Sequence, residues 1–170
     1  PDSTALRLPG RDVLPLLHRT TSNALADLLP GGARATLFCD FRGRLLHRAV
    51  VAVASDGAVW LLRPDAPGAE LAAAVDRMVF RDDVHIADRS SEFTVVLANA
   101  EPGDEGVLAE RAAVPLVVAT ADGTQLALDG RAAMDESERI ARLLPRHGHE
   151  IAEAFNPFEV GLAGEVHLNK

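Results

Sequence analysis

The apolar positions in the first third of the chain predict two short helices followed by strands. Residues Val13 to Leu17 form an apolar face, and Pro15 limits the length of this helix because it lacks a backbone N–H. A second short helix is predicted over residues 25–29, where three leucines share one side. The turn formers at residues 30–32 (Pro-Gly-Gly) end it.

The next apolar runs predict three strands joined by tight turns. The strands are predicted at Ala35–Cys39, Leu45–Ala54 and Val59–Leu62. The first turn lies at residues 40–43, and Ser-Asp-Gly at residues 55–57 is a strong hairpin signal. These three strands are therefore expected to pair antiparallel, each with the next.

A longer helix and a short strand follow. Four apolar residues lie on one face of a helix running from about residue 68 to residue 80: Leu71, Val75, Met78 and Val79. Residues 84–86 (Val-His-Ile) are predicted as a short strand.

The rest of the pattern predicts further strands and one capped helix. The strands are expected at residues 93–97, 114–120 and 126–128, with a polar loop at 101–106 and a turn at 122–123. Asp135 and Glu138 have the spacing of a capping box, so a helix is predicted from Asp135 to Pro145.

Hairpins interleaved with helices, without regular strand–helix–strand repetition, predict an α+β fold with antiparallel sheets. We expect two small antiparallel-sheet lobes with packed helices, the first over residues 1–90 and the second over residues 91–145. Residues 146–170 are expected to return and pack on the first lobe.

Composition narrows the class of protein. The 170 residues carry a net charge of −8 and are 48% hydrophobic, which is typical of a soluble globular protein. Negative charge argues against non-specific binding to nucleic acid or to an anionic membrane. No apolar run reaches the roughly 18 residues that cross a bilayer. Cys39 is the single cysteine, so no intrachain disulfide is expected, and we predict a cytoplasmic monomer.

Three segments carry a resemblance to a known family. They are residues 6–51 (LRLPGRDVLPLL to LHRAVV), residues 79–88 (VFRDDVHIAD) and residues 136–170, which end in NPFEVGLAGEVHLNK. In this order they resemble the folate-binding YgfZ family, relatives of the glycine-cleavage T protein. Lys170 matches the lysine that opens the family signature K-G-C-Y-x-G-Q-E. Residues 91–134 match weakly and look shorter than the usual second lobe.

The resemblance implies a pocket for tetrahydrofolate or another reduced folate. It also implies an accessory role in the maturation or repair of iron–sulfur proteins, with those proteins or their assembly machinery as partners. Members normally continue into a C-terminal β-barrel, which is not expected within residues 1–170. Two alternatives stay open: a tetrahydrofolate-dependent aminomethyltransferase, and a degenerate folate-binding module without chemistry.

Glu159 is the leading candidate for a folate contact. In NPFEVGL it matches a carboxylate that T proteins place in a Pro-x-Glu segment to grip the pterin ring. A pterin presents an exocyclic amino group beside a ring N–H, which suits the two oxygens of one carboxylate. The alternative is an exposed loop glutamate.

His47 and Arg48 depart from the T-protein pattern. The resemblance aligns them with an Asp-Asp pair whose carboxylate serves folate amine chemistry in the aminomethyltransferases. An arginine cannot replace that carboxylate, because it stays cationic and only donates hydrogen bonds. We therefore expect no catalytic residue here, and Arg48 becomes a candidate for the glutamate tail of the folate.

Other candidates for the folate site have simple structural alternatives. Asp40 and Arg44 flank the turn after Cys39, where Asp40 either closes the turn or contacts the ligand. Trp60 and Phe41 are candidates to stack on the pterin, although an aromatic residue in a hairpin is more often part of the core.

A metal site is not expected from the sequence. His147-Gly148-His149 offers two histidines, and Asp82, Asp83 and His85 offer further ligands, but neither group has the spacing typical of a zinc site. Cys39 ends an apolar strand and is expected to be a buried hydrophobic residue rather than a reactive thiol.

Overall fold

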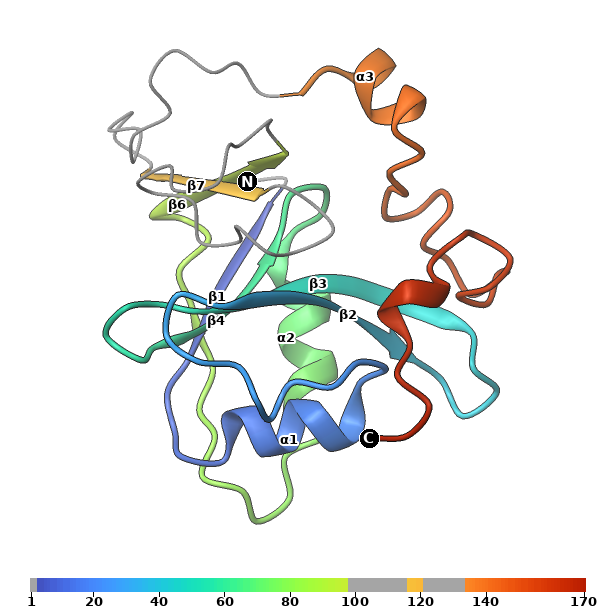
Figure 1. Ribbon diagram of the computed structural model, residues 1–170. Coiled ribbons are helices and arrows are strands. Elements are labelled where there is room, and N and C mark those ends of the chain that lie inside the picture. The colour runs from blue at the N-terminus through green and yellow to red at the C-terminus, as the bar shows by residue number, and fades with distance from the viewer. Residues whose placement is uncertain (1–2, 98–115, 121–133) are drawn as a thin grey trace.

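The computed structural model, which describes residues 3–97, 116–120 and 134–170, is built on two antiparallel sheets (Figure 1). The larger sheet has the strand order β2-β3-β4-β1-β5, and the smaller sheet pairs β6 with β7. The strands are β1 (Thr4–Leu8), β2 (Ala33–Cys39), β3 (Leu45–Val53), β4 (Val59–Arg63), β5 (Ala87–Asp88), β6 (Phe93–Leu97) and β7 (Leu116–Thr120). The α+β class with antiparallel sheets is confirmed.

Two helices cover one face of the larger sheet, below it in Figure 1. They are α1 (Val13–Thr20) and α2 (Gly68–Asp76). Pro15 lies in the first turn of α1, where its missing N–H costs no helical hydrogen bond. Leu16 and Leu71 are fully buried in one apolar cluster with inward-facing residues of β1, β3 and β4. This cluster is the main core of the protein.

The opposite face of the sheet carries a smaller core. Val50 and Leu62 lie there with Val95 of β6, and Trp60 packs at its edge. The Val95 N–H also donates to Ser3 Oγ at 3.1 Å, which ties β6 to the start of β1. This arrangement places the smaller sheet above the larger one, as Figure 1 shows.

The final segment, residues 146–170, runs along the end of the β2–β3 hairpin. Ile151 and Leu162 bury against Leu37 and Leu45, and the Leu45 N–H donates to the Phe155 carbonyl at 2.9 Å. A short 3₁₀-helix, η1 (Ala163–Glu165), follows. We call residues 146–170 the return segment, because they contact the hairpin formed more than one hundred positions earlier.

The end of the return segment lies against α1. His167 donates its backbone N–H to the Ser22 carbonyl at 2.9 Å. The Lys170 ammonium donates to the carbonyls of His18, Thr21 and Asn23, which gather at the C-terminal end of α1. A cation is favourable there because helix carbonyls leave a partial negative charge at this end.

The predicted second helix is wrong: residues 25–28 form a single turn, with the Leu28 N–H donating to the Leu25 carbonyl at 3.1 Å. Residues 25–29 are too few for two helical turns. His18 Nδ1 accepts from the N–H groups of Leu25 and Ala26 at the start of this turn.

The strand predicted at residues 84–86 is also wrong, because pairing with β1 occurs at Ala87–Asp88 instead. The ladder stops before Pro9, which has no N–H to donate to a partner strand. The helix predicted to reach residue 80 ends at Asp76.

The other predicted elements hold where the structure describes them. The β3–β4 hairpin turns at Gly57, whose φ is 83°. Asp135 accepts a bond from the Glu138 N–H at 2.8 Å and caps α3 (Glu136–Ala141), which ends before the predicted Pro145. The polar loop at 101–106, the turn at 122–123 and the strand at 126–128 lie outside the described residues. No helix in the described part is long and apolar enough to cross a bilayer.

Candidate functional site

The turn between β2 and β3 is organised by Asp40. Its Oδ1 accepts from the N–H groups of Arg42 and Arg44 at 2.8 and 2.9 Å. Gly43 occupies the left-handed region, with a φ of 75°, as a tight turn of this kind favours. Asp40 therefore closes the turn, which is the structural alternative considered for it.

Glu159 lies in the part of the return segment that contacts this turn. Its Oε2 accepts from the Asn156 N–H at 2.7 Å and lies 3.4 Å from Arg44 Nη1. Arg44 Nη1 also donates to the Ala154 carbonyl at 3.1 Å. These contacts fix the carboxylate in position while leaving the side chain half-exposed.

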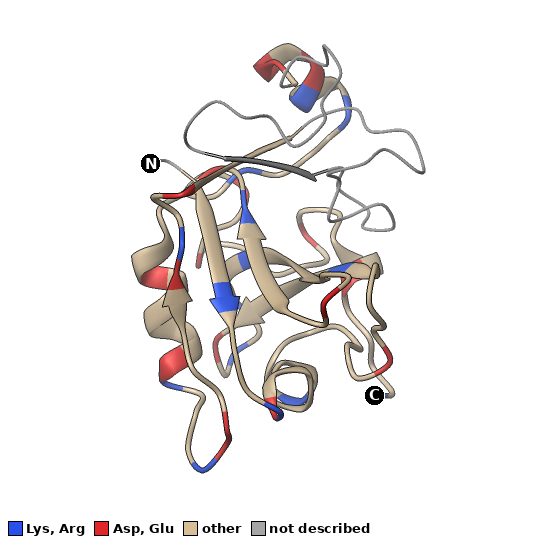
Figure 2. Ribbon diagram, turned by 90° about the vertical axis from the view of Figure 1, so that its left-hand side faces the viewer, with Lys and Arg blue, Asp and Glu red and all other residues tan. Residues whose placement is uncertain are grey.

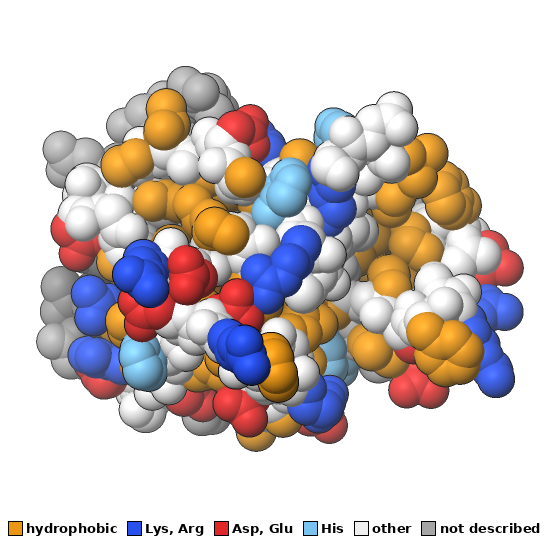
Figure 3. Space-filling model, turned by 90° about the horizontal axis from the view of Figure 1, so that it is seen from below, with side chains coloured by type: hydrophobic (Ala, Val, Ile, Leu, Met, Phe, Trp, Pro, Cys, Tyr) orange, Lys and Arg blue, Asp and Glu red, His pale blue; other side chains and the backbone are white. Residues whose placement is uncertain are grey.

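Exposed phenyl rings occur in the same turn and in the same part of the return segment as this carboxylate and its partner Arg44. Phe41 in the turn is 92% exposed, Phe158 is 63% exposed and Phe155 is 38% exposed. Hydrophobic side chains gather at the same end of the molecule in Figure 3. We call Phe41, Arg44, Phe155, Phe158 and Glu159 the hairpin-end surface.

Arg48 does not reach this surface, because it is bound elsewhere. Its guanidinium grips Glu165 of η1 through both carboxylate oxygens, with Nε at 2.9 Å from Oε2. The Glu165 side chain is buried, and that of Arg48 is only 12% exposed. The pair joins the return segment to the sheet. It also engages the Arg48 guanidinium, which we considered as a contact for the folate tail.

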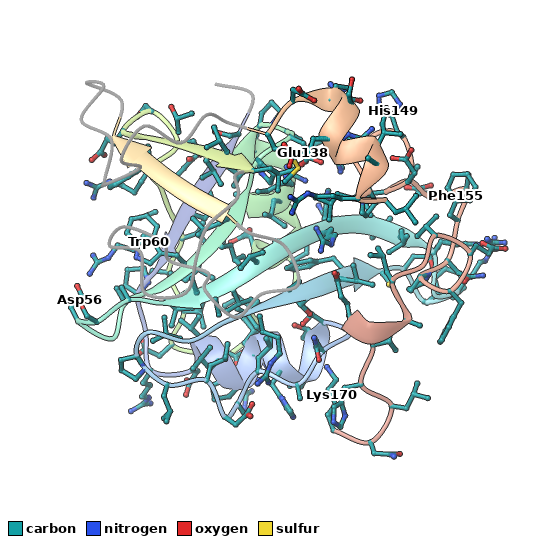
Figure 4. All side chains as sticks on the ribbon, turned by 45° about the horizontal axis from the view of Figure 1, so that its top comes forward. Asp56, Trp60, Glu138, His149, Phe155 and Lys170 are labelled. Atoms are coloured by element: carbon teal, nitrogen blue, oxygen red, sulfur yellow. The ribbon has the colours of Figure 1, made fainter. Side chains whose placement is uncertain are left out.

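Trp60 is also separate from the hairpin-end surface. It packs edge-on against Phe93, with 5.3 Å between ring centroids and 71° between ring planes. Figure 4 shows Trp60 and Phe155 at opposite ends of the molecule. Of the predicted residues, the structure brings Asp40 and Glu159 together through Arg44, while Arg48 and Trp60 lie apart from them.

A second polar cluster surrounds Arg63, at the point where β4 leads into α2. Arg63 is only 1% exposed, and its Nη2 donates to the Pro67 carbonyl at 2.5 Å. Its Nη1 lies 3.1 Å from His47 Nδ1. A guanidinium only donates, so His47 Nδ1 accepts and the proton of the neutral ring sits on Nε2. The Arg63 Nε is buried without a hydrogen-bond partner among the described residues.

His147 of the return segment packs on His47. The two imidazoles stack with 5.6 Å between centroids and 15° between planes. The backbone N–H of His147 donates to Asp65 Oδ2 at 2.7 Å, and the ring Nε2 of His147 lies 3.8 Å from Glu70 Oε2. One potential ligand atom from each of His47, Glu70 and His147 lies within 4.8 Å of the other two.

Both imidazoles of this cluster are neutral at pH 7. Burial lowers the pKa of His47 to about 4, and the positive charge of Arg63 acts in the same direction. Burial also lowers the pKa of His147, again with a contribution from Arg63.

The cluster opens into a cavity of about 530 Å³ between the start of β3, α2 and the return segment. His47, Glu70 and His147 all line it, together with Arg77 and Glu153. Charged residues of both signs are spread over the loops and helices around the sheets in Figure 2. The lining of the cavity therefore combines the neutral imidazoles of His47 and His147, the carboxylates of Glu70 and Glu153 and the guanidinium of Arg77.

Sequence reasoning missed most of this cluster. It noted His147 beside His149, but the structure stacks His147 on His47, one hundred residues away in the sequence. Arg63 and Glu70 belong to ordinary-looking runs at the end of a strand and the start of a helix. An arginine that directly ends the apolar run of β4 was the one available signal for Arg63.

The remaining candidates have structural partners. Asp82 pairs with Arg19 at 2.7 Å, and Asp83 lies 3.6 Å from His85 Nε2. Burial raises the pKa of the Cys39 thiol, which disfavours the reactive thiolate.

Comparisons with known proteins find likenesses among solved structures. No protein-family model matches the sequence, and no curated protein matches it. Among solved structures, the chain is similar to the glycine cleavage system aminomethyltransferase T from Bartonella henselae, with 14% sequence identity and a TM-score of 0.48. The match covers 55% of this chain and 26% of that protein, so it spans about a quarter of the length of its neighbour.

Proposed function

We propose that this chain binds a reduced folate at the hairpin-end surface and acts as an accessory protein of the YgfZ type in iron–sulfur protein maturation or repair. The sequence resemblance supports this proposal, because it selects Glu159 as the residue that grips a pterin. The observation that carries the proposal is the setting of that residue: a half-exposed carboxylate, fixed by Asn156 and Arg44, in a stretch of chain that also exposes phenyl rings.

The hairpin-end surface matches the chemistry of a folate in three respects. A carboxylate accepts the paired N–H donors of a pterin. Exposed phenyl rings such as Phe158 offer a flat apolar surface to the heteroaromatic ring, and aromatic contacts contribute roughly 0.5–1.5 kcal/mol each beyond burial. Arg44, together with Arg42 in the adjoining turn, provides cations for the anionic tail of the ligand.

An accessory role is favoured over aminomethyl transfer by the surroundings of residues 47 and 48. The transferases use a carboxylate at this point of the alignment, whereas His47 is buried against Arg63 and Arg48 is bound to Glu165. Neither side chain is available to stabilise a cationic amine of the substrate. The protein is therefore expected to bind the folate without releasing ammonia from an aminomethylated lipoyl carrier.

The binding claim is tested by calorimetric titration with 5-formyltetrahydrofolate. Glu159→Gln is expected to weaken binding roughly tenfold or more, because a charged hydrogen bond becomes a mismatched neutral one. Glu92→Gln is a matched control: Glu92 and Glu159 are each 50% exposed and each pairs with one arginine. Equal affinity of the wild type and Glu159→Gln would exclude Glu159 from the site.

The accessory role is tested in cells that lack the gene for this protein. Iron–sulfur enzyme activity is expected to fall and to be restored by the wild-type gene but not by the Glu159→Gln variant. Normal iron–sulfur enzyme activity in cells without the gene contradicts the accessory role. Ammonia release from an aminomethylated carrier would instead identify a transferase.

A further inference from the structure

We propose that His47, Glu70 and His147 form a binding site for a divalent first-row transition metal, with Zn²⁺ as the expected occupant. The three residues come from β3, α2 and the return segment, and one potential ligand atom of each lies within 4.8 Å of the other two. None of them belongs to the hairpin-end surface, so this inference is independent of the proposed folate site.

The set of ligands suits zinc. Two neutral imidazoles and one carboxylate make a three-ligand site, and such sites leave a fourth position open to water or a substrate. Ligand atoms about 2.0–2.1 Å from a tetrahedral metal lie roughly 3.4 Å apart. The 3.8 Å between His147 Nε2 and Glu70 Oε2 is close to that spacing. The open position would face the cavity of about 530 Å³ that all three residues line.

The two histidines are held firmly while the carboxylate is able to move. The His47 ring contacts Phe38 edge-on, with 6.2 Å between ring centroids, and stacks on His147. The His147 backbone is anchored on Asp65. Glu70 is largely exposed in the first turn of α2, so its side chain can close the remaining distance at little cost.

Arg63 is expected to lower the affinity of this site for metal. It donates to His47 Nδ1, which leaves the ring proton on Nε2, so Nε2 is the His47 atom that we propose as the metal ligand. When a metal takes Nε2, the proton moves to Nδ1, and Arg63 gives up this contact. No proton leaves the ring. Because the metal competes with this contact and with the nearby positive charge, we expect micromolar affinity rather than the tight binding of a structural zinc site.

Metal binding would link the return segment to the sheet and to α2. The protein should therefore be stabilised by metal, because a ligand that binds only the folded state raises the midpoint of thermal unfolding. This effect is a readout that needs no assumption about activity.

The test is titration of the chelator-treated protein with Co²⁺, followed by its visible absorption, and with Zn²⁺ in competition with a chromophoric chelator. One equivalent is expected to bind, with Zn²⁺ raising the unfolding midpoint. His147→Ala and Glu70→Gln are expected to weaken binding tenfold or more. His149→Ala is the matched control and should bind like the wild type, because His149 is exposed and outside the cluster.

Two results would overturn the inference. The first is no binding of Co²⁺ or Zn²⁺ below millimolar concentration. The second is loss of binding in His149→Ala with no loss in Glu70→Gln, which would assign the metal to the local His-Gly-His sequence instead. Glu70 is exposed, so Glu70→Gln should fold normally even if a histidine variant does not.

Discussion

Two Arg–Glu pairs join the return segment to the β2–β3 hairpin, and their burial predicts very different contributions to stability. The side chains of Arg48 and Glu165 are 12% and 7% exposed, whereas those of Arg44 and Glu159 are 41% and 50% exposed. Removing one partner of a buried pair leaves an uncompensated charge and costs about 3–5 kcal/mol. An exposed pair contributes about 0–1 kcal/mol.

Glu165→Ala is therefore expected to lower the free energy of unfolding by about 3–5 kcal/mol, and Glu159→Ala by less than about 1 kcal/mol. Both changes remove one carboxylate from the same segment, so net charge is matched. With a urea dependence of about 2 kcal/mol per molar, Glu165→Ala should lower the unfolding midpoint by about 2 M. Trp60 is the single tryptophan and gives the fluorescence signal.

The double variant Arg48→Met with Glu165→Leu separates charge from packing. Replacing both partners by apolar side chains removes the unpaired charge, so stability should return to within about 1–2 kcal/mol of the wild type. Equal destabilisation by Glu165→Ala and Glu159→Ala would refute the argument from burial. So would a double variant as unstable as Glu165→Ala alone.

Three further predictions follow from other contacts. Gly10→Ala should lower the unfolding free energy by several kcal/mol in urea titration, because a Cβ there would lie 1.9 Å from the Asp83 carbonyl oxygen and φ is 133°; near-wild-type stability would show that this loop can move. The pKa of His47 is lowered from 6.5 to about 4, so protonation of this ring favours the unfolded chain. With a chelator present to remove metal, the stability that the neutral ring contributes is complete above pH 6.5 and is lost as the pH falls towards 4. A shift of this size corresponds to roughly 3 kcal/mol. His47→Gln should remove that part of the pH dependence of the unfolding free energy; an unchanged pH dependence would contradict the assignment. Lys170→Met should lower the thermal midpoint by a few degrees, because the carbonyls at the end of α1 lose a cation; an unchanged midpoint would show that the contact adds nothing.

The sequence predicted those parts of the fold that depend on local chemistry. The Ser-Asp-Gly turn specified the β3–β4 hairpin, and Asp135 specified the start of α3, because each signal acts over a few residues. The helix expected at residues 25–29 does not form, because five residues are too few for two helical turns and Pro30 follows them directly. The pairing of β1 ends at Leu8, because Pro9 has no N–H to donate to a partner strand.

The candidate site was predictable only in part. Asp40 and Glu159 were selected from a turn and a motif, and the structure places both at one end of the hairpin. The partner of Arg48 is 117 residues away, so no spacing rule connects it to Glu165. The cluster around His47 likewise depends on strand register and on the path of the return segment, which are properties of the assembled fold.

The most direct test of the central claim is a map of the amides that respond to ligand. Backbone amide resonances of the isotopically labelled protein would be followed by NMR during titration with 5-formyltetrahydrofolate. Binding at the hairpin-end surface predicts saturable shifts at residues 40–45 and 154–160, with little change at Trp60. Shifts confined to other residues, or no shifts at millimolar ligand, would contradict the proposed site.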